Sequence, residues 1–153
     1  MKQLRKAVFP GSFNPIHSGH INIIKRAANL FDYLYVVVSK NIDKKYEYKL
    51  EQRLINVQKV VDKLKLKNVK VVSNTGLTID LVKKLHCQYI VRSIRNAKDV
   101  GYEVNMAQNN NILSGNVETI FFVADSKLKD VSSTNRKELI RQKQLISKGT
   151  KHV

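Results

Sequence analysis

Short apolar runs alternate with longer amphipathic segments along this chain. The apolar runs are β-branched and hardly alternate with polar residues, which is typical of strands covered on both faces. They predict strands at 6–10, 34–39, 69–73, 89–92 and 119–124. Apolar residues at helical spacing predict helices at 20–31, 50–64, 77–85, 100–113 and 134–146. This order predicts an α/β fold, a Rossmann-like open parallel five-stranded sheet with helices on both faces.

Chemistry in such a sheet is expected in the loops that follow the strands, because ligands bind at the carboxyl ends of parallel strands. These loops begin at Pro10, Ser39, Asn74, Arg92 and Asp125. No repeat, low-complexity tract or Pro/Gly/Ser-rich linker interrupts the pattern. The sequence therefore predicts a single domain over residues 1–153, with residues 148–153 as a mobile tail.

The charge balance is strongly basic, with 28 Lys and Arg against 12 Asp and Glu and a formal net charge of +16. Such a field attracts polyanions, from nucleic acids to small polyphosphates. The lysines are scattered through the expected helices, so we interpret most of them as solvated surface. A basic nucleic-acid-binding module is the alternative from another class. No RRM, KH, zinc or helix-turn-helix signature supports it, so we expect no specific nucleic-acid partner.

Compartment and redox state follow from what the chain contains. No apolar run approaches the ~20 residues of a membrane span, and the first residues lack a signal-peptide apolar stretch. The single cysteine, Cys87, has no internal disulfide partner and is expected to be a small core residue. These features predict a cytoplasmic protein without membrane contact.

The loop between the first predicted strand and the first predicted helix reads FPGSFNPIHSGH over residues 9–20. Gly11 allows a tight turn, Gly19 allows close approach to the backbone, and Ser12 offers a hydroxyl. The amide groups at a helix start attract anions, so this loop is a candidate phosphate site. Two alternatives compete here. His17 and His20 could be zinc ligands, although no other His or Cys is near in sequence. The turn could also be a plain helix cap formed by Ser18.

The sequence HSGH, placed after a strand and PGSFNP, resembles the HxGH signature of the nucleotidyltransferase superfamily. The segments 44–53, 92–95 and 131–134, together with Tyr102 and Glu103, narrow the match. Over residues 6–138 the chain is similar to the bacterial phosphopantetheine adenylyltransferases. Neither GxxxxGK[ST] nor GxGxxG occurs, which argues against P-loop kinases and dinucleotide dehydrogenases.

The resemblance implies a reaction and its partners. AMP would pass from ATP, with Mg²⁺, to 4'-phosphopantetheine, giving dephospho-coenzyme A and pyrophosphate in coenzyme A biosynthesis. The attack would be direct and in line, without a covalent enzyme intermediate. An acceptor phosphate that is already anionic needs no general base. The reaction requires alignment of two mutually repelling anions and relief of charge at the α-phosphorus, which cations and helix amides supply. The resemblance also implies a homohexamer, and coenzyme A as a feedback inhibitor.

The resemblance assigns roles to residues at matching positions. The catalytic group would be His20, Lys44 and Arg95. The ATP-binding set would be Ser12, Phe13, His17, His20, Ser93, Ile94, Arg95, Glu103, Leu128, Lys129, Asp130, Val131, Ser132, Ser133 and Thr134. The phosphopantetheine-binding set would be Ser12, Lys44, Leu77, Thr78 and Arg92. No side chain is expected to bind a metal, and Mg²⁺ would be held by ATP.

The sequence departs from the family at a few of these positions. Ser93 stands where a glycine is usual, Asn109–Asn111 stands where an Asn-Arg pair is frequent, and Leu128 replaces a frequent Trp. Sister enzymes of the superfamily are the nearest alternative, namely a nicotinate-mononucleotide adenylyltransferase or a glycerol-phosphate cytidylyltransferase. Lys137, three residues after Thr134, favours the phosphopantetheine enzymes over both.

Overall fold

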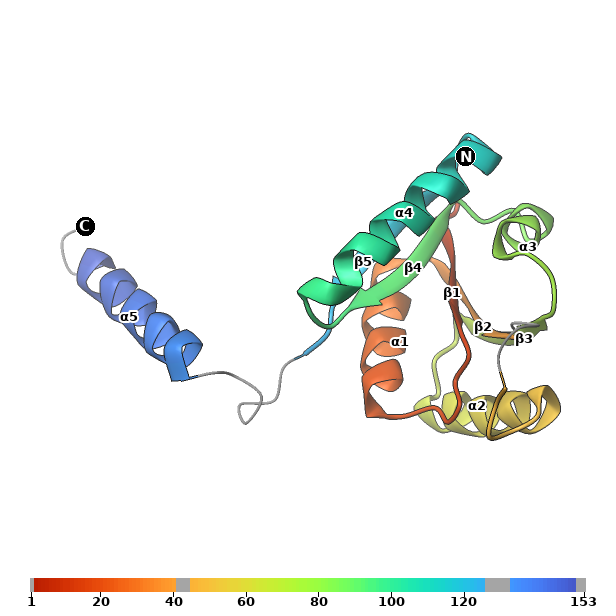
Figure 1. The fold of residues 1–153 in the computed structure, drawn as a ribbon, viewed down its shortest axis with the longest axis horizontal. Coiled ribbons are helices and arrows are strands. Elements are labelled where there is room, and N and C mark those ends of the chain that lie inside the picture. Colours follow the sequence, from red (N-terminus) through yellow and green to blue (C-terminus); the bar gives the residue numbers. More distant parts are fainter. Residues whose placement is uncertain (1, 41–44, 126–132, 151–153) are drawn as a thin grey trace.

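The protein, described by a computed structural model over residues 2–40, 45–125 and 133–150, contains one parallel sheet with helices on its faces (Figure 1). The strands lie in the order β3-β2-β1-β4-β5, and every pairing is parallel. The predicted Rossmann-like α/β class is therefore confirmed. Along the chain the elements are β1 Lys6–Gly11, α1 Ser18–Leu30, β2 Tyr33–Ser39, α2 Leu50–Leu64, β3 Val69–Asn74, α3 Thr78–Lys84, β4 Tyr89–Ile94, α4 Ala97–Ser114, β5 Glu118–Val123 and α5 Ser133–Thr150.

The element ends differ from the prediction where local hydrogen bonds extend an element. Helix α4 begins at Ala97 instead of residue 100, because the side chain of Asn96 accepts from the backbone N–H groups of Lys98 and Asp99 and caps the helix. Strand β4 continues two residues further than predicted, to Ile94. Ser93 consequently lies within a strand and not in the loop after it.

Alternate residues of each central strand pack on opposite faces of the sheet. Ala7 and Phe9 of β1 join a cluster with the buried residues of α1 and α2. Val8, between them, joins a second cluster with Ile79 and Val82 of α3. This alternation follows the two-residue repeat of a strand. It places α1 and α2 on one face and α3 on the other, where α4 contacts α3, β4 and β5 (Figure 1). Cys87 is buried in the second cluster, as expected.

The strand order reverses between β1 and β4, which is where an open α/β sheet offers a ligand crevice. The paired positions of these two strands are Ala7 with Tyr89 and Val8 with Ile90. Two residues later β1 reaches Pro10, which has no N–H to donate to a neighbouring strand. The carboxyl ends of β1 and β4 thus frame the site at the reversal point.

Helix α5 is drawn apart from the sheet and the other helices in Figure 1. Within the described part of the chain, no helix combines the length and the apolar character needed to cross a bilayer.

Candidate active site

The start of α1 is organised by two histidines. The Nδ1 atom of His17 accepts from the N–H of Gly19 at 3.0 Å, and Nδ1 of His20 accepts from the N–H of His17 at 3.1 Å. These two bonds form a reciprocal capping box, with His17 as the cap. The two rings stack with their centroids 3.8 Å apart. The cap is therefore His17, and the alternative in which Ser18 caps this helix is wrong.

The hydrogen bond that His20 accepts fixes which nitrogen carries its proton. With Nδ1 as acceptor, the neutral ring holds its proton on Nε2, which is left to donate to a ligand. The pKa of His20 is lowered to about 4, first by burial and then by the charges of His17 and Arg95. His20 is thus a neutral hydrogen-bond donor at physiological pH. The described residues contain no group of three or more His, Cys, Asp or Glu that could hold a metal ion.

Phe13 is buried and packs against the ring of His20. Its side chain is 1% exposed, and its ring lies 4.8 Å from that of His20 and 5.6 Å from that of Phe9. Its backbone has a positive φ of 48°. A Cβ atom at Gly11 would meet the Phe13 ring at 3.1 Å, so the turn at residue 11 has little room for a side chain. Any contact of Phe13 with a nucleotide would have to come from its backbone.

Arg92 of β4 and Glu103 of α4 form a bidentate ion pair. Nε and Nη2 of Arg92 donate to the two carboxylate oxygens of Glu103 at 2.9 and 2.6 Å. Nη1 of Arg92 donates to the carbonyl oxygen of Pro10 at 3.0 Å. The hydrogen bond with Glu103 is the main cause of a raised pKa of Arg92. Glu103 is consequently buried against Arg92.

The end of β4 carries the next three expected residues. Ser93 and Ile94 are half-buried in the strand. Arg95 follows the strand with a side chain that is 71% exposed, and its Nε lies 3.8 Å from Asp99. Its charge contributes to the lowered pKa of His20, so the two side chains interact electrostatically. The structure thus brings a neutral histidine and an exposed cation to the same edge of the sheet.

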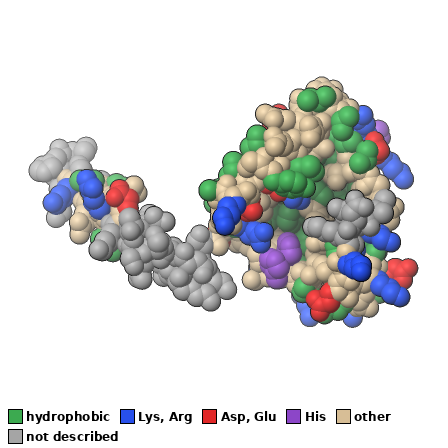
Figure 2. All heavy atoms as spheres, viewed as in Figure 1, with side chains coloured by type: hydrophobic (Ala, Val, Ile, Leu, Met, Phe, Trp, Pro, Cys, Tyr) green, Lys and Arg blue, Asp and Glu red, His purple; other side chains and the backbone are tan. Residues whose placement is uncertain are grey.

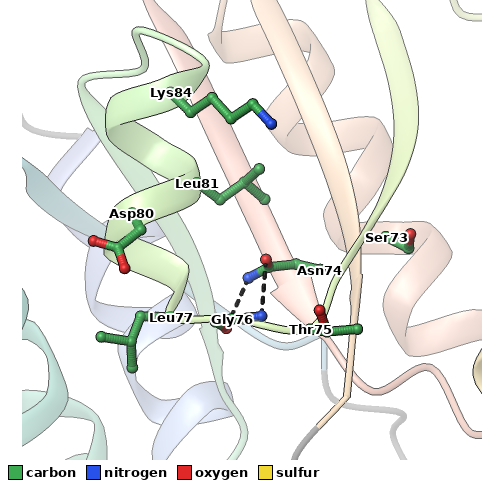
Figure 3. A pocket seen from close by; sticks show the side chains of 8 residues that line it. All are labelled: Ser73, Asn74, Thr75, Gly76, Leu77, Asp80, Leu81 and Lys84. Atoms are coloured by element: carbon green, nitrogen blue, oxygen red, sulfur yellow. Dashed lines mark hydrogen bonds between the residues drawn. The ribbon is translucent and has the colours of Figure 1, made fainter.

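A pocket of about 290 Å³ opens at the carboxyl end of β3 (Figure 3). It is lined by Ser73, Asn74, Thr75, Gly76, Leu77, Asp80, Leu81 and Lys84. The Asn74 side chain bonds both the N–H and the carbonyl oxygen of Gly76, which holds the loop that forms one wall. Leu77 lines this pocket, whereas Thr78 starts α3 and is not among the lining residues.

Several of the expected site residues lie outside the described part of the chain. Lys44 and residues 128–132 (Leu128, Lys129, Asp130, Val131 and Ser132) lie outside the described residues. Ser133 and Thr134 begin α5, and their side chains also lie outside the description. The placement of these residues at a triphosphate or an acceptor phosphate stays a prediction.

Sequence reasoning missed Arg53, a residue of α2. Its side chain is 1% exposed and donates to the carbonyl oxygens of Ser12, Ser39 and Tyr48. A signal was present in the sequence, because Arg53 interrupts the apolar stripe formed by Leu50, Leu54 and Val57. A cation on the buried face of a helix needs polar partners, and here they are backbone oxygens near the candidate site.

Figure 2 shows histidine side chains beside Lys and Arg side chains on one face of the main body. The arrangement of a helix start, a neutral imidazole and several cations can hold anionic groups and stabilise charge on them. It offers no Ser-His-Asp triad or paired carboxylates among the described side chains.

The chain matches the cytidylyltransferase-like family over residues 8–139. It is 41% identical to the phosphopantetheine adenylyltransferase of Limosilactobacillus fermentum over 136 residues, which cover 89% of this chain and 78% of that protein. It is 38% identical to the phosphopantetheine adenylyltransferase of Mycoplasma mycoides subsp. mycoides, over 89% of this chain and 96% of that one. Among solved structures, the lipopolysaccharide core biosynthesis protein of Thermoplasma volcanium aligns with a TM-score of 0.60 and 21% identity. That alignment covers 81% of this chain and 100% of the other, and at this identity it bears on the fold alone.

Proposed function

Because the chain belongs to the cytidylyltransferase-like family, and within it to the phosphopantetheine adenylyltransferases, we propose that it transfers AMP from ATP to 4'-phosphopantetheine. The products are dephospho-coenzyme A and pyrophosphate, which places the step in coenzyme A biosynthesis. The observation that carries this proposal is the stacked His17–His20 pair at the start of α1, in which His20 is neutral and is influenced by the charge of Arg95. These groups suit the binding of phosphates, and the relatives of the chain are named phosphopantetheine adenylyltransferases.

The chemistry is a direct displacement at the α-phosphorus of ATP. An oxygen of the acceptor phosphate forms a bond to phosphorus while the bond to pyrophosphate breaks. The acceptor is already an anion, so the protein has to align two mutually repelling groups and relieve charge on the reacting phosphate. Nε2–H of His20 and the first amides of α1 supply donors for that charge, and Arg95 adds a cation nearby.

Arg92 and the pocket beside Leu77 are the candidate groups for the acceptor. Two N–H bonds of Arg92 go to Glu103 and one goes to Pro10, which leaves two of its five donors for an acceptor phosphate. The pocket beside Leu77 offers room for the pantetheine arm (Figure 3). Lys44 completes this set in the proposal.

Magnesium enters with ATP in this proposal. Mg²⁺ would be held by phosphate oxygens of ATP and by water, which are donors that suit it. Bound in that way, the metal neutralises phosphate charge. The residues of the protein position the nucleotide around it.

Three further properties belong to the proposal. A homohexamer would cover apolar side chains that are exposed on α4, among them Tyr102, Met106 and Ile112. Coenzyme A shares the acceptor's pantetheine arm and would compete for its site as a feedback inhibitor. A reaction that consumes ATP also fits a cytoplasmic enzyme.

The relatives do not favour the alternatives. A nicotinate-mononucleotide adenylyltransferase or a glycerol-phosphate cytidylyltransferase would share the fold but take another acceptor or CTP. A basic nucleic-acid-binding module would have no use for the His17–His20 arrangement. Neither alternative is supported by a specific observation on this chain.

The direct test is pyrophosphate release from ATP and magnesium, with and without phosphopantetheine. We expect release that depends on phosphopantetheine and falls about 10²- to 10³-fold in His20→Ala, because the variant lacks the Nε2–H donor. His86→Ala is the matched control, since His86 is exposed at the far end of α3. Release that depends on another acceptor would move the substrate to a sister family, and no release with any acceptor would sink the enzyme proposal.

A further inference from the structure

Arg53 is a buried cation without a carboxylate partner among the described residues. Only Arg53 and Glu103 are buried among the charged side chains described, and the latter pairs with Arg92. Arg53 has no described ion pair. A buried charge is tolerated only where other polar groups replace its water. The groups around Arg53 therefore identify what it holds together.

The guanidinium of Arg53 is surrounded by backbone oxygens and one aromatic ring. Its Nη1 donates to the carbonyl oxygens of Ser12 at 2.6 Å and Ser39 at 2.9 Å, and its Nε donates to that of Tyr48 at 3.1 Å. The ring of Tyr46 lies 4.1 Å from the guanidinium carbon. The planar fork of an arginine can satisfy this set, because its donors point in several fixed directions.

These contacts join three segments at the carboxyl end of the sheet. Ser12 belongs to the loop after β1 that leads to the histidine pair, Ser39 ends β2, and Tyr48 precedes α2. A second bond reinforces the link, because the N–H of Tyr48 donates to Oδ1 of Asn14 at 3.0 Å. In sequence, Ser39 and Tyr48 flank the stretch that contains Lys44. Arg53 thus ties the loop after β1 to both ends of that stretch.

We propose that Arg53 is a positioning residue for adenylyl transfer, which ties the loop carrying Ser12 to Ser39 at the end of β2 and to Tyr48 just before α2. This inference rests on the proposed function, since it concerns the placement of the acceptor beside the nucleotide. The histidine pair is also held by its own capping box. Loss of Arg53 should therefore impair the acceptor side more than the ATP side.

The charge of Arg53 has an electrostatic effect that must be separated from its positioning effect. A cation at this edge of the sheet adds to the positive potential for phosphates. Arg53→Lys retains the charge, but an ammonium group donates from one atom and cannot span the oxygens of Ser12, Ser39 and Tyr48. Arg53→Met removes both the charge and the donors. The two variants together separate positioning from potential.

The experiment measures kcat and the KM for each substrate in the wild type, Arg53→Lys, Arg53→Met and Val61→Ala. Val61 is buried on the same helix, two turns further from the site, so Val61→Ala controls for a loss of packing in α2. Thermal unfolding of each protein sets an assay temperature at which all of them are folded. Arg53→Lys keeps the inference testable if Arg53→Met does not fold.

We expect kcat/KM for phosphopantetheine to fall at least tenfold in Arg53→Lys, while KM for ATP changes less than threefold. Val61→Ala should keep both constants within twofold of the wild type. If the wild type is active and Arg53→Lys has unchanged constants, or loses equally for both substrates, this inference alone is overturned. A wild type without adenylyl transfer would overturn the proposed function, and this inference with it.

Discussion

At the scale of single residues, hydrogen-bond partners decide what each polar group can do. His20 is neutral because it is buried and lies beside positive charges, and its Nδ1 accepts from the backbone N–H of His17. Arg92 is oriented because Glu103 and Pro10 take three of its donors. In both cases the residue type supplies the functional group, and its neighbours set the protonation state or the orientation of that group.

The lowered pKa of His20 predicts how stability depends on pH. The unfolded chain takes up a proton on this histidine near pH 6.5, whereas the folded chain does so only near pH 4. The contribution of neutral His20 to stability is therefore fully present above pH 6.5 and is lost as the pH falls towards 4. His20→Gln does not titrate and serves as the reference. The free energy of unfolding of the wild type relative to this variant should decline by about 2 kcal/mol over that range, allowing for partial exposure. Urea unfolding between pH 7 and 4 measures it, and a constant difference would contradict the lowered pKa.

The Arg92–Glu103 pair predicts a loss of stability in Glu103→Gln. The neutral amide keeps the shape but leaves a partly buried guanidinium without its charged acceptor, so the free energy of unfolding should fall by about 2 kcal/mol. Glu118→Gln is the control, because Glu118 is exposed on β5. Urea unfolding at pH 7 compares the two variants. Equal stability of both would show that the pair contributes nothing in solution.

At the scale of elements, the start of α1 is the feature that organises the site. The chain turns at Gly11, buries Phe13, and enters the helix with two histidines that cap it in place of a serine. The residues that cap α1 are therefore also the residues that carry the candidate chemistry. A change that moves either ring disturbs both the cap and the site.

Gly19→Ala tests this coupling. A Cβ atom at position 19 would lie 2.9 Å from Cε1 of the His17 ring and 3.0 Å from its Nδ1, so the ring has to leave the stack on His20. We expect kcat/KM to fall about tenfold or more, as displaced catalytic groups predict. Stability should change by less than about 1 kcal/mol, because the better helix propensity of alanine offsets the weakened cap.

Ser18→Ala is the control in the same helical turn. Ser18 is exposed and does not cap the helix, so its stability should stay within about 0.5 kcal/mol of the wild type. Steady-state kinetics and thermal unfolding of the two variants give the comparison. Full activity in Gly19→Ala would show that the histidine stack is not needed.

At the scale of the whole molecule, the parallel sheet gathers the site from segments far apart in sequence. The order β3-β2-β1-β4-β5 brings the carboxyl ends of β1 and β4 together. It also leaves apolar side chains of α4 on the surface, of which Ile112 is 78% exposed. An exposed set of this kind is typical of a surface that another protein covers.

The proposed homohexamer is testable through this surface. Sedimentation velocity should give a species about six times the 17.6 kDa chain mass, and Ile112→Glu should shift it to smaller species. Burying a carboxylate in an apolar interface is strongly unfavourable, whereas the same charge facing water is tolerated. Leu30→Glu, on exposed surface of α1, should leave the assembly unchanged. A wild type that sediments as a monomer would refute the hexamer.

The sequence by itself determined the fold class, the order of elements and the family. Apolar runs and helical spacing are local properties, and for α2 both predicted ends agree with the structure. The HSGH motif at the first strand–helix junction also located the histidine pair, because a motif and its neighbours in sequence stay together in space.

Only the tertiary structure decided which polar groups meet. Glu103 is eleven residues from Arg92 and Arg53 is forty-one from Ser12, and nothing in the local pattern specifies either contact. The cap of α1 was also decided in three dimensions, because the ring of His20 has to turn back onto His17 to complete it. Hydrogen bonds between distant segments depend on how the sheet aligns the strand ends, and that alignment is a property of the folded chain.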